Sequence, residues 1–182
     1  MEPVFTMQYA EFKVANCLAE KISDASVFIP ASAQEKGIDL LLYRHCDGRN
    51  TTNTVQVKMS RTYYSKKAAD EYPYYLWFNR FDVPKNADWF VLVGIYARLP
   101  KEAGSLKGQD WGEIMLAFTN EEMRTFMDEV RQKRNPEKAD KMFGFGFDDE
   151  EHIVQTRGYA TKRDMSAYLL ENRLAEIENS FR

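Results

Sequence analysis

Two alternating segments joined by a turn-rich link constrain the fold of this chain more than any other feature. Ile38–Arg44 and Thr54–Ser60 each alternate in the manner of a half-buried β-strand. The link between them, Asp47–Asn53, is rich in Asp, Asn, Gly and Thr, which favour tight turns. The sequence therefore predicts an antiparallel hairpin at the centre of a sheet.

Composition and charge narrow the class of protein. The chain has 182 residues, of which 44% are hydrophobic and 29% charged, so we expect one globular domain over residues 1–182. The net charge of −3 weighs against non-specific coating of nucleic acid but allows a local basic groove. The longest apolar run, Trp89–Ala97, is far shorter than the roughly 20 residues of a membrane span. With no signal peptide and no metal spacing between Cys17 and Cys46, we expect a cytoplasmic protein without a membrane partner.

Hydrophobic periodicity predicts a mixed α/β (α+β) fold. Predicted helices cover Met7–Lys21, Asn120–Arg134 and Arg163–Phe181, with a shorter one in Ser65–Glu71. Besides the hairpin, predicted strands cover Ser26–Pro30, Tyr74–Asn79, Asp88–Tyr96, Glu113–Phe118, Met142–Phe147 and Ile153–Arg157. The order of these elements predicts a mixed sheet flanked by helices, with Asp88–Tyr96 buried on both faces.

Polar residues of the hairpin suggest a metal site. The hairpin brings Asp39 close to Gln56 and Lys58, and strand alternation places Gln56, Lys58 and Ser60 on one face. Mg²⁺ (or Mn²⁺) prefers oxygen ligands, which the Asp39 carboxylate, the Gln56 amide and the carbonyl of Val57 would supply. Lys58 would orient water or stabilise developing negative charge. This layout is typical of a metal-dependent phosphodiesterase.

Glu11 is an independent indication of the same site. It lies on the apolar stripe of the first predicted helix, where an unpaired carboxylate costs several kcal/mol. Holding the water at a metal centre would explain it; alternatively, Glu11 sits at the edge of the stripe and reaches solvent. Asp39 has an alternative as a turn residue after Gly37, and Gln56 and Lys58 as a solvated strand face. Their coincidence favours a site.

The residues in this pattern resemble a known family. Glu11, Gly37–Asp39 and Gln56–Lys58 resemble the PD-(D/E)XK nuclease superfamily, which has the restriction-endonuclease-like fold with an α-β-β-β-α-β core. A Gln two residues before the lysine is similar to the Mrr-like branch, with its Asp…Gln-x-Lys pattern. The resemblance covers a core of about residues 7–97, and residues 98–182 would form a C-terminal elaboration of strands and helices.

The resemblance implies specific roles and a reaction. Asp39 would be the main metal ligand, Lys58 the catalytic lysine and Glu11 the first-helix acid, with Gln56 and the carbonyl of Val57 completing the metal and catalytic set. The implied function is a Mg²⁺- (or Mn²⁺-) dependent endonuclease acting on DNA. The superfamily also contains members that lost cleavage. The alternative is therefore an inactive nucleic-acid-binding or protein-interaction module of the same fold.

Basic and aromatic residues follow the motif. We expect Ser60, Arg61, Lys66 and Lys67 to contact nucleic acid. The aromatic residues of the segment 63–78 would stack on bases, or, beyond residue 73, belong to a core strand; a homodimer interface is a further alternative. Phe143–Phe147 alternates Phe and Gly, but four acids follow it, so we predict a hairpin or loop there rather than a phosphate-binding loop.

Overall fold

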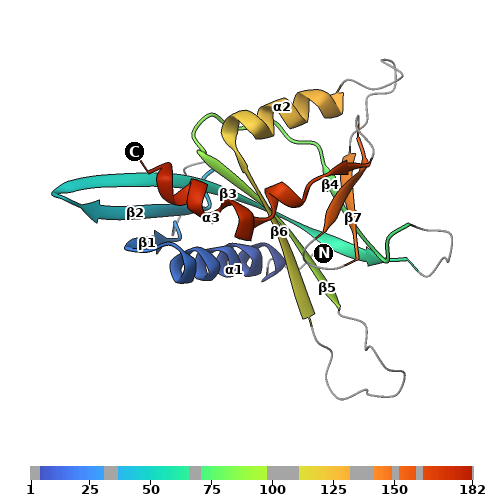
Figure 1. The fold of residues 1–182 in the computed structure, drawn as a ribbon, viewed down its shortest axis with the longest axis horizontal. Helices are drawn as coiled ribbons and strands as arrows, with labels where there is room; N and C mark the ends of the chain where they lie inside the picture. Colours follow the sequence, from blue (N-terminus) through green and yellow to red (C-terminus); the bar gives the residue numbers. More distant parts are fainter. Residues whose placement is uncertain are drawn as a thin grey trace.

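A computed structural model describes residues 5–30, 37–65, 71–97, 111–131, 142–148, 152–158 and 162–181. Within these ranges the fold is α+β, with three α-helices and a mostly antiparallel nine-stranded sheet (Figure 1). The helices are α1 (Phe5–Lys21), α2 (Asn120–Arg131) and α3 (Leu170–Asn179), and a 3₁₀ turn, η2, spans Ser166–Tyr168. The strands are β1 (Ala25–Phe28), β2 (Leu40–Cys46), β3 (Arg49–Tyr64), β4 (Tyr74–Asn79), β5 (Trp89–Ala97), β6 (Trp111–Thr119), β7 (Met142–Phe147), β8 (Ile153–Arg157) and β9 (Arg163–Asp164).

The long strand β3 connects two parts of the sheet. Its first part pairs antiparallel with β2 and parallel with β5, and together with β1 and β6 these strands form what we call the main sheet. Its last residues, Thr62–Tyr64, pair instead with β4, which continues through β7, β8 and β9 as the side sheet. Figure 1 shows β3 running between the two parts. The predicted site residues from Gln56 to Arg61 therefore lie on β3 just before it passes from the main sheet into the side sheet.

The β2–β3 hairpin is tighter than the sequence analysis predicted. Asp47 and Gly48 both have positive φ, 51° and 71°, which is typical of the two-residue turn that matches strand twist. Cys46 pairs directly with Arg49, so the predicted link Asp47–Asn53 is wrong beyond Gly48. Residues 49–53 instead extend β3.

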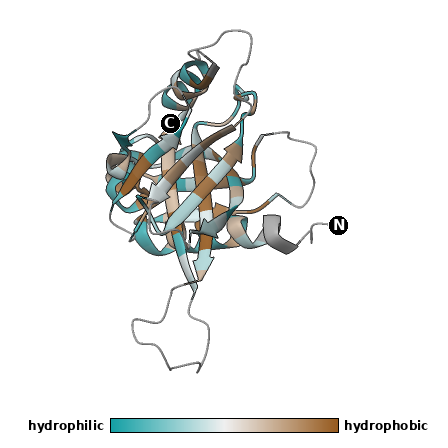
Figure 2. Cartoon of the chain, turned by 90° about the vertical axis from the view of Figure 1, so that its right-hand side faces the viewer, coloured by the Kyte–Doolittle hydropathy of each residue, from teal (hydrophilic) through white to brown (hydrophobic). Residues whose placement is uncertain are grey.

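Two apolar layers cover the main sheet. Helices α1 and α3 pack on one face, where the predicted stripe Val14, Leu18 and Ile22 is almost completely buried. Helix α2 packs on the opposite face together with the inner side of β4 and β7. β5 contributes side chains to both layers, which confirms that this strand is buried on both faces. Figure 2 shows the hydrophobic strands inside the molecule.

The last predicted helix, Arg163–Phe181, is wrong in its first third. Arg163 and Asp164 form β9, and α3 begins only at Leu170. Leu169 has extended dihedral angles (φ −54°, ψ 134°) and bridges Leu116 of β6, which keeps this residue out of the helix. The Asp164 carboxylate also accepts a hydrogen bond from the Ser166 backbone N–H (2.8 Å), a local competitor to helix formation.

The order of elements agrees in part with the predicted α-β-β-β-α-β arrangement. α1 precedes three antiparallel strands, and β5 then returns parallel to β3. In the described part of the β3–β5 connection the chain forms β4 and an extended segment rather than a helix. Residues 66–70, where a short helix was predicted, and 132–134, the predicted end of the second long helix, lie outside the described residues.

Candidate functional site

Asp39 is held against the edge of β3 where β2 begins. Its backbone N–H donates to the carbonyl of Val55 (2.9 Å), and its Oδ2 accepts a hydrogen bond from the N–H of Val57 (2.7 Å). The N–H and C=O of one residue point toward the same edge of an extended strand. The carbonyl of Val57 therefore faces the same side as the Asp39 carboxylate, so two oxygen donors meet at this edge.

Gly37 makes this placement of Asp39 feasible. Its φ is +92°, which disfavours any residue with a Cβ, and a Cβ there would lie 2.7 Å from Pro84 Cγ. The chain can thus turn tightly beside the segment that leads into β5 and deliver Asp39 to β3. The Gly-x-Asp part of the motif has a local structural cause.

Gln56 is the most unusual polar residue of this region. Its side chain is only 6% exposed, and Oε1 is buried without a hydrogen-bond partner among the described residues. Extending the register Leu40↔Val55 by one pair places Asp39 beside Gln56. A buried acceptor without a partner costs roughly 1–3 kcal/mol, so this oxygen is suited to a ligand or an ordered water.

Glu11 interacts electrostatically with both Asp39 and Lys58. Partial burial raises the pKa of Glu11 most, repulsion by the Asp39 carboxylate raises it further, and the Lys58 ammonium opposes both effects. Glu11 lies on α1 one turn before Val14 and is partly exposed. Three chain segments thus contribute charged groups to one electrostatic environment.

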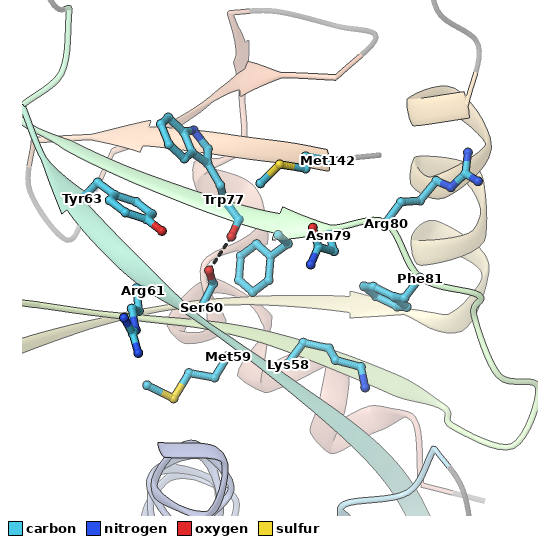
Figure 3. A pocket seen from close by; sticks show the side chains of 11 residues that line it. Lys58, Met59, Ser60, Arg61, Tyr63, Trp77, Asn79, Arg80, Phe81 and Met142 are labelled. Carbon is cyan, nitrogen blue, oxygen red and sulfur yellow. Dashed lines mark hydrogen bonds between the residues drawn. The ribbon is translucent and has the colours of Figure 1, made fainter. Parts of the chain in front are cut away.

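Lys58 projects from β3 into a cleft. Its Nζ lies 5.7 Å from the centroid of the Phe81 ring, within cation–π range (Figure 3). Figure 3 also shows Met59 and Arg61 on the opposite side of β3 from Lys58 and Ser60, as strand alternation requires. The exposed Arg61 side chain therefore leaves β3 on the other side from Lys58, although both residues line the cleft described below.

Three further residues, Ser60, Lys66 and Lys67, were predicted to contact nucleic acid. The Ser60 hydroxyl donates to the backbone carbonyl of Trp77, so its proton ties β3 to β4 rather than facing solvent. Lys66 and Lys67 lie outside the described residues.

The cleft lies where β3 and β4 diverge. The two strands pair only over Thr62–Tyr64 and Tyr74–Leu76, and then separate. A cavity of about 500 Å³ opens between them, lined by Lys58, Met59, Ser60, Arg61, Tyr63, Trp77, Phe78, Asn79, Arg80, Phe81 and Met142. Sequence reasoning missed Asn79, Arg80 and Phe81. The sequence signal that could have indicated them was the polar pair Asn79–Arg80 directly after the aromatic-rich segment that ends at Phe78.

The donor set at the edge of β3 fits a hard divalent cation. The Asp39 carboxylate, the unpartnered Gln56 Oε1 and the Val57 carbonyl are all oxygens, as Mg²⁺ requires. Within the described residues no group of three or more His, Cys, Asp or Glu side chains is arranged to hold a metal. Mg²⁺ commonly uses one or two carboxylates with water and substrate phosphate, so this donor set is compatible with that mode.

Comparisons with family models, curated proteins and solved structures found no match to this chain. Among the helices in the described ranges, none has the length and apolar character needed to cross a membrane.

Proposed function

We propose that this chain is a Mg²⁺- (or Mn²⁺-) dependent nuclease of the PD-(D/E)XK superfamily that hydrolyses phosphodiester bonds in DNA. The observation that carries this proposal is the electrostatic coupling of Glu11 to Asp39 and Lys58 beside the buried, unpartnered oxygen of Gln56. Packing alone would favour apolar or paired groups in these positions. Binding of a divalent cation and a phosphate would account for the unpaired polar groups at these positions.

The arrangement of elements supports the same proposal. The order α1, β1, β2, β3 and the parallel return of β5 agree with most of the core expected for this superfamily. The described part of the connection between β3 and β5 forms β4, which separates from β3 beside Lys58 and opens the cleft there. In this proposal the chain is a variant of the restriction-endonuclease-like fold.

Each residue has a distinct chemical role in the proposed reaction. A bound divalent cation supplies Lewis-acid polarisation of the scissile phosphate and lowers the pKa of water. Asp39, Gln56 and the Val57 carbonyl would hold that cation. Lys58 stabilises the negative charge that develops on the phosphate oxygens. Glu11 orients the attacking water, and its raised pKa makes it a better proton acceptor than an ordinary carboxylate.

Calorimetric titration of Mg²⁺ and Mn²⁺ tests the proposal. Asp39→Asn keeps an oxygen that can accept the Val57 N–H but removes the charge, so we expect cation binding to disappear in this variant. Asp24→Asn, at an exposed turn position after α1, is the matched control and should bind as the wild type does. Equal cation affinity in wild type and Asp39→Asn would contradict the assignment.

A second candidate is a nucleic-acid-binding module that has lost cleavage. Gln56 stands where the superfamily usually has an acid, and the described residues contain no cluster of three acidic or other classical metal ligands. Gln56→Glu separates the two candidates. In an active nuclease it should change the dependence of cleavage on metal concentration; in a binding module it should produce no cleavage and leave salt-sensitive binding intact.

A further inference from the structure

The outer face of the side sheet carries a row of aromatic rings. In β4 the side chains of Tyr74, Leu76 and Phe78 face the core, while those of Tyr75 and Trp77 face outward. Tyr75 pairs with Tyr63 of β3, which is 50% exposed. The ring centroids of Tyr63 and Trp77 lie 5.0 Å apart with planes inclined by 30°, a partly stacked pair. Beyond residue 73 the segment thus belongs to a core strand, as one predicted alternative had it, but only every second side chain faces the core.

Two glycines in β7 create the space for these rings. Gly144 pairs with Trp77, and a Cβ at that position would overlap the indole ring. A Cβ at Gly146 would meet the ring of Tyr72 at 2.5 Å. The intervening phenylalanines, Phe143, Phe145 and Phe147, all point inward and are completely buried. The alternation of Phe and Gly therefore lets outer aromatic rings lie close against the strand.

The two ends of this aromatic row differ in the charged residues that surround them. At the Trp77 end the cleft contains the cationic side chains of Lys58 and Arg80. At the other end burial raises the pKa of Tyr72 most, the acidic residues Glu71 and Asp148 that lie there raise it further, and Glu71 is paired with Lys162 (3.6 Å). A negatively charged polymer would accordingly place its phosphates at the Lys58 end.

We propose that the cleft between β3 and β4 binds an unpaired nucleotide of a single-stranded nucleic acid, with its base against the half-exposed ring of Tyr63 next to Trp77 and its phosphates toward Lys58 and Arg80, which also line the cleft. This inference rests on the proposed nuclease function and names its substrate class. Base stacking on aromatic side chains requires an open base face, which an unpaired strand offers and an intact duplex does not. The exposed amide of Asn79 at the cleft can donate to and accept from a base edge.

Fluorescence titration with short oligothymidylate, in chelator so that no cleavage occurs, tests the proposal. Stacking on Trp77 should quench its emission, and Trp77→Ala should lower affinity about 10-fold. Tyr63→Ala, at a half-exposed position, provides a second variant if Trp77→Ala fails to fold. Trp111→Ala is the matched control, because Trp111 is 53% exposed on β6 and does not line the cleft. A duplex of equal length should bind more weakly than the single strand.

Three outcomes would overturn the proposal. These are unchanged oligothymidylate affinity in both aromatic variants, a preference for duplex, or the absence of oligonucleotide binding together with self-association that Trp77→Ala abolishes. An oligouridylate titration distinguishes RNA from DNA as the source of the strand. The assay contains no metal, so its outcome does not depend on cation binding at Asp39. Failure of catalysis and failure of strand recognition are therefore separate results.

Discussion

The middle and the C-terminal end of β3 differ in how well the polar groups of their side chains are hydrogen-bonded. Near its middle, Gln56 has a buried oxygen without a partner in the described chain, and Glu11 and Asp39 bring like charges together. Near its end, the Ser60 hydroxyl bonds the Trp77 carbonyl, and the ring of Tyr63 stacks on that of Trp77. The first region lowers the stability of the fold, whereas the second contributes to it.

This difference separates two kinds of evidence for function. Groups that cost free energy need a purpose beyond folding, so the region around Gln56 argues for chemistry more strongly. Outer aromatic rings stabilise the sheet whether or not they bind a ligand, so their role requires a binding measurement. Substitutions in the first region should reduce activity without reducing stability, and those in the second should reduce stability.

Lys58→Ala should produce the largest effect. If Lys58 stabilises charge on the phosphate, its loss should reduce cleavage about 100- to 1,000-fold. Folding should change little, because the contact with Phe81 contributes at most about 1 kcal/mol. Cleavage of a labelled oligonucleotide and urea unfolding measure the two quantities. Lys85→Ala, at an exposed turn position before β5, is the control. Wild-type cleavage by Lys58→Ala would remove this residue from the catalytic set.

Gly144→Ala should affect stability instead. The added methyl group overlaps the indole of Trp77 and comes within 2.9 Å of the Leu76 carbonyl, so we expect a loss of roughly 1–3 kcal/mol in the free energy of unfolding. In a Trp77→Ala background the loss should be smaller, because one of the two overlaps is gone. Additive losses in this double-mutant cycle would show that the glycine does not serve to accommodate the ring.

Gln56→Leu should increase the stability of the fold, whereas most substitutions of buried residues decrease it. Removing the amide, whose Oε1 has no hydrogen-bond partner among the described residues, should raise the free energy of unfolding by about 1 kcal/mol and abolish binding of Mg²⁺. Asn53→Leu is the contrasting variant, since the buried Asn53 amide donates to the carbonyl of Ile177 (3.2 Å) and to Ser180 Oγ (2.9 Å). That variant should lose stability. Destabilisation by Gln56→Leu would indicate that the amide is satisfied in solution.

Local signals predicted the strands of both sheets, and β4, β7 and β8 have the bounds that the sequence analysis gave them. The alternation in 38–44 and 54–60 and the apolar run around β5 reflect burial by neighbouring layers, which the sequence records at each position. The residues Asp47 and Gly48, which form the turn, were also part of the predicted link, although that link extended beyond them. By contrast, Leu169 is extended because it bridges Leu116, more than 50 positions away by the residue numbers, and no local pattern encodes that contact.

The candidate site also has one part that local sequence signals predict and one part that depends on tertiary packing. The relation of Asp39 to Gln56 and Lys58 follows from hairpin register, so residue spacing was sufficient to propose it. The cleft depends on where β3 and β4 separate, which tertiary packing determines. That Arg80 and Phe81 line the same cleft as Lys58 could therefore not be predicted from the sequence.

Glu11→Gln should give the smallest effect, and its sign is specific. The pKa of Glu11 in the folded protein lies above its ordinary value of 4.5, so the folded state holds this proton more tightly than the unfolded state does. The stability contributed by the protonated group is present below 4.5 and is lost as pH rises through the folded-state pKa. Gln cannot ionise, so the variant should match the wild type at acidic pH and become more stable than it toward neutral pH. Urea unfolding in chelator across this range measures the difference, with Glu20→Gln on the exposed side of α1 as the control. A constant difference at all pH values would show that neither burial nor Asp39 raises the pKa of Glu11 in the folded protein.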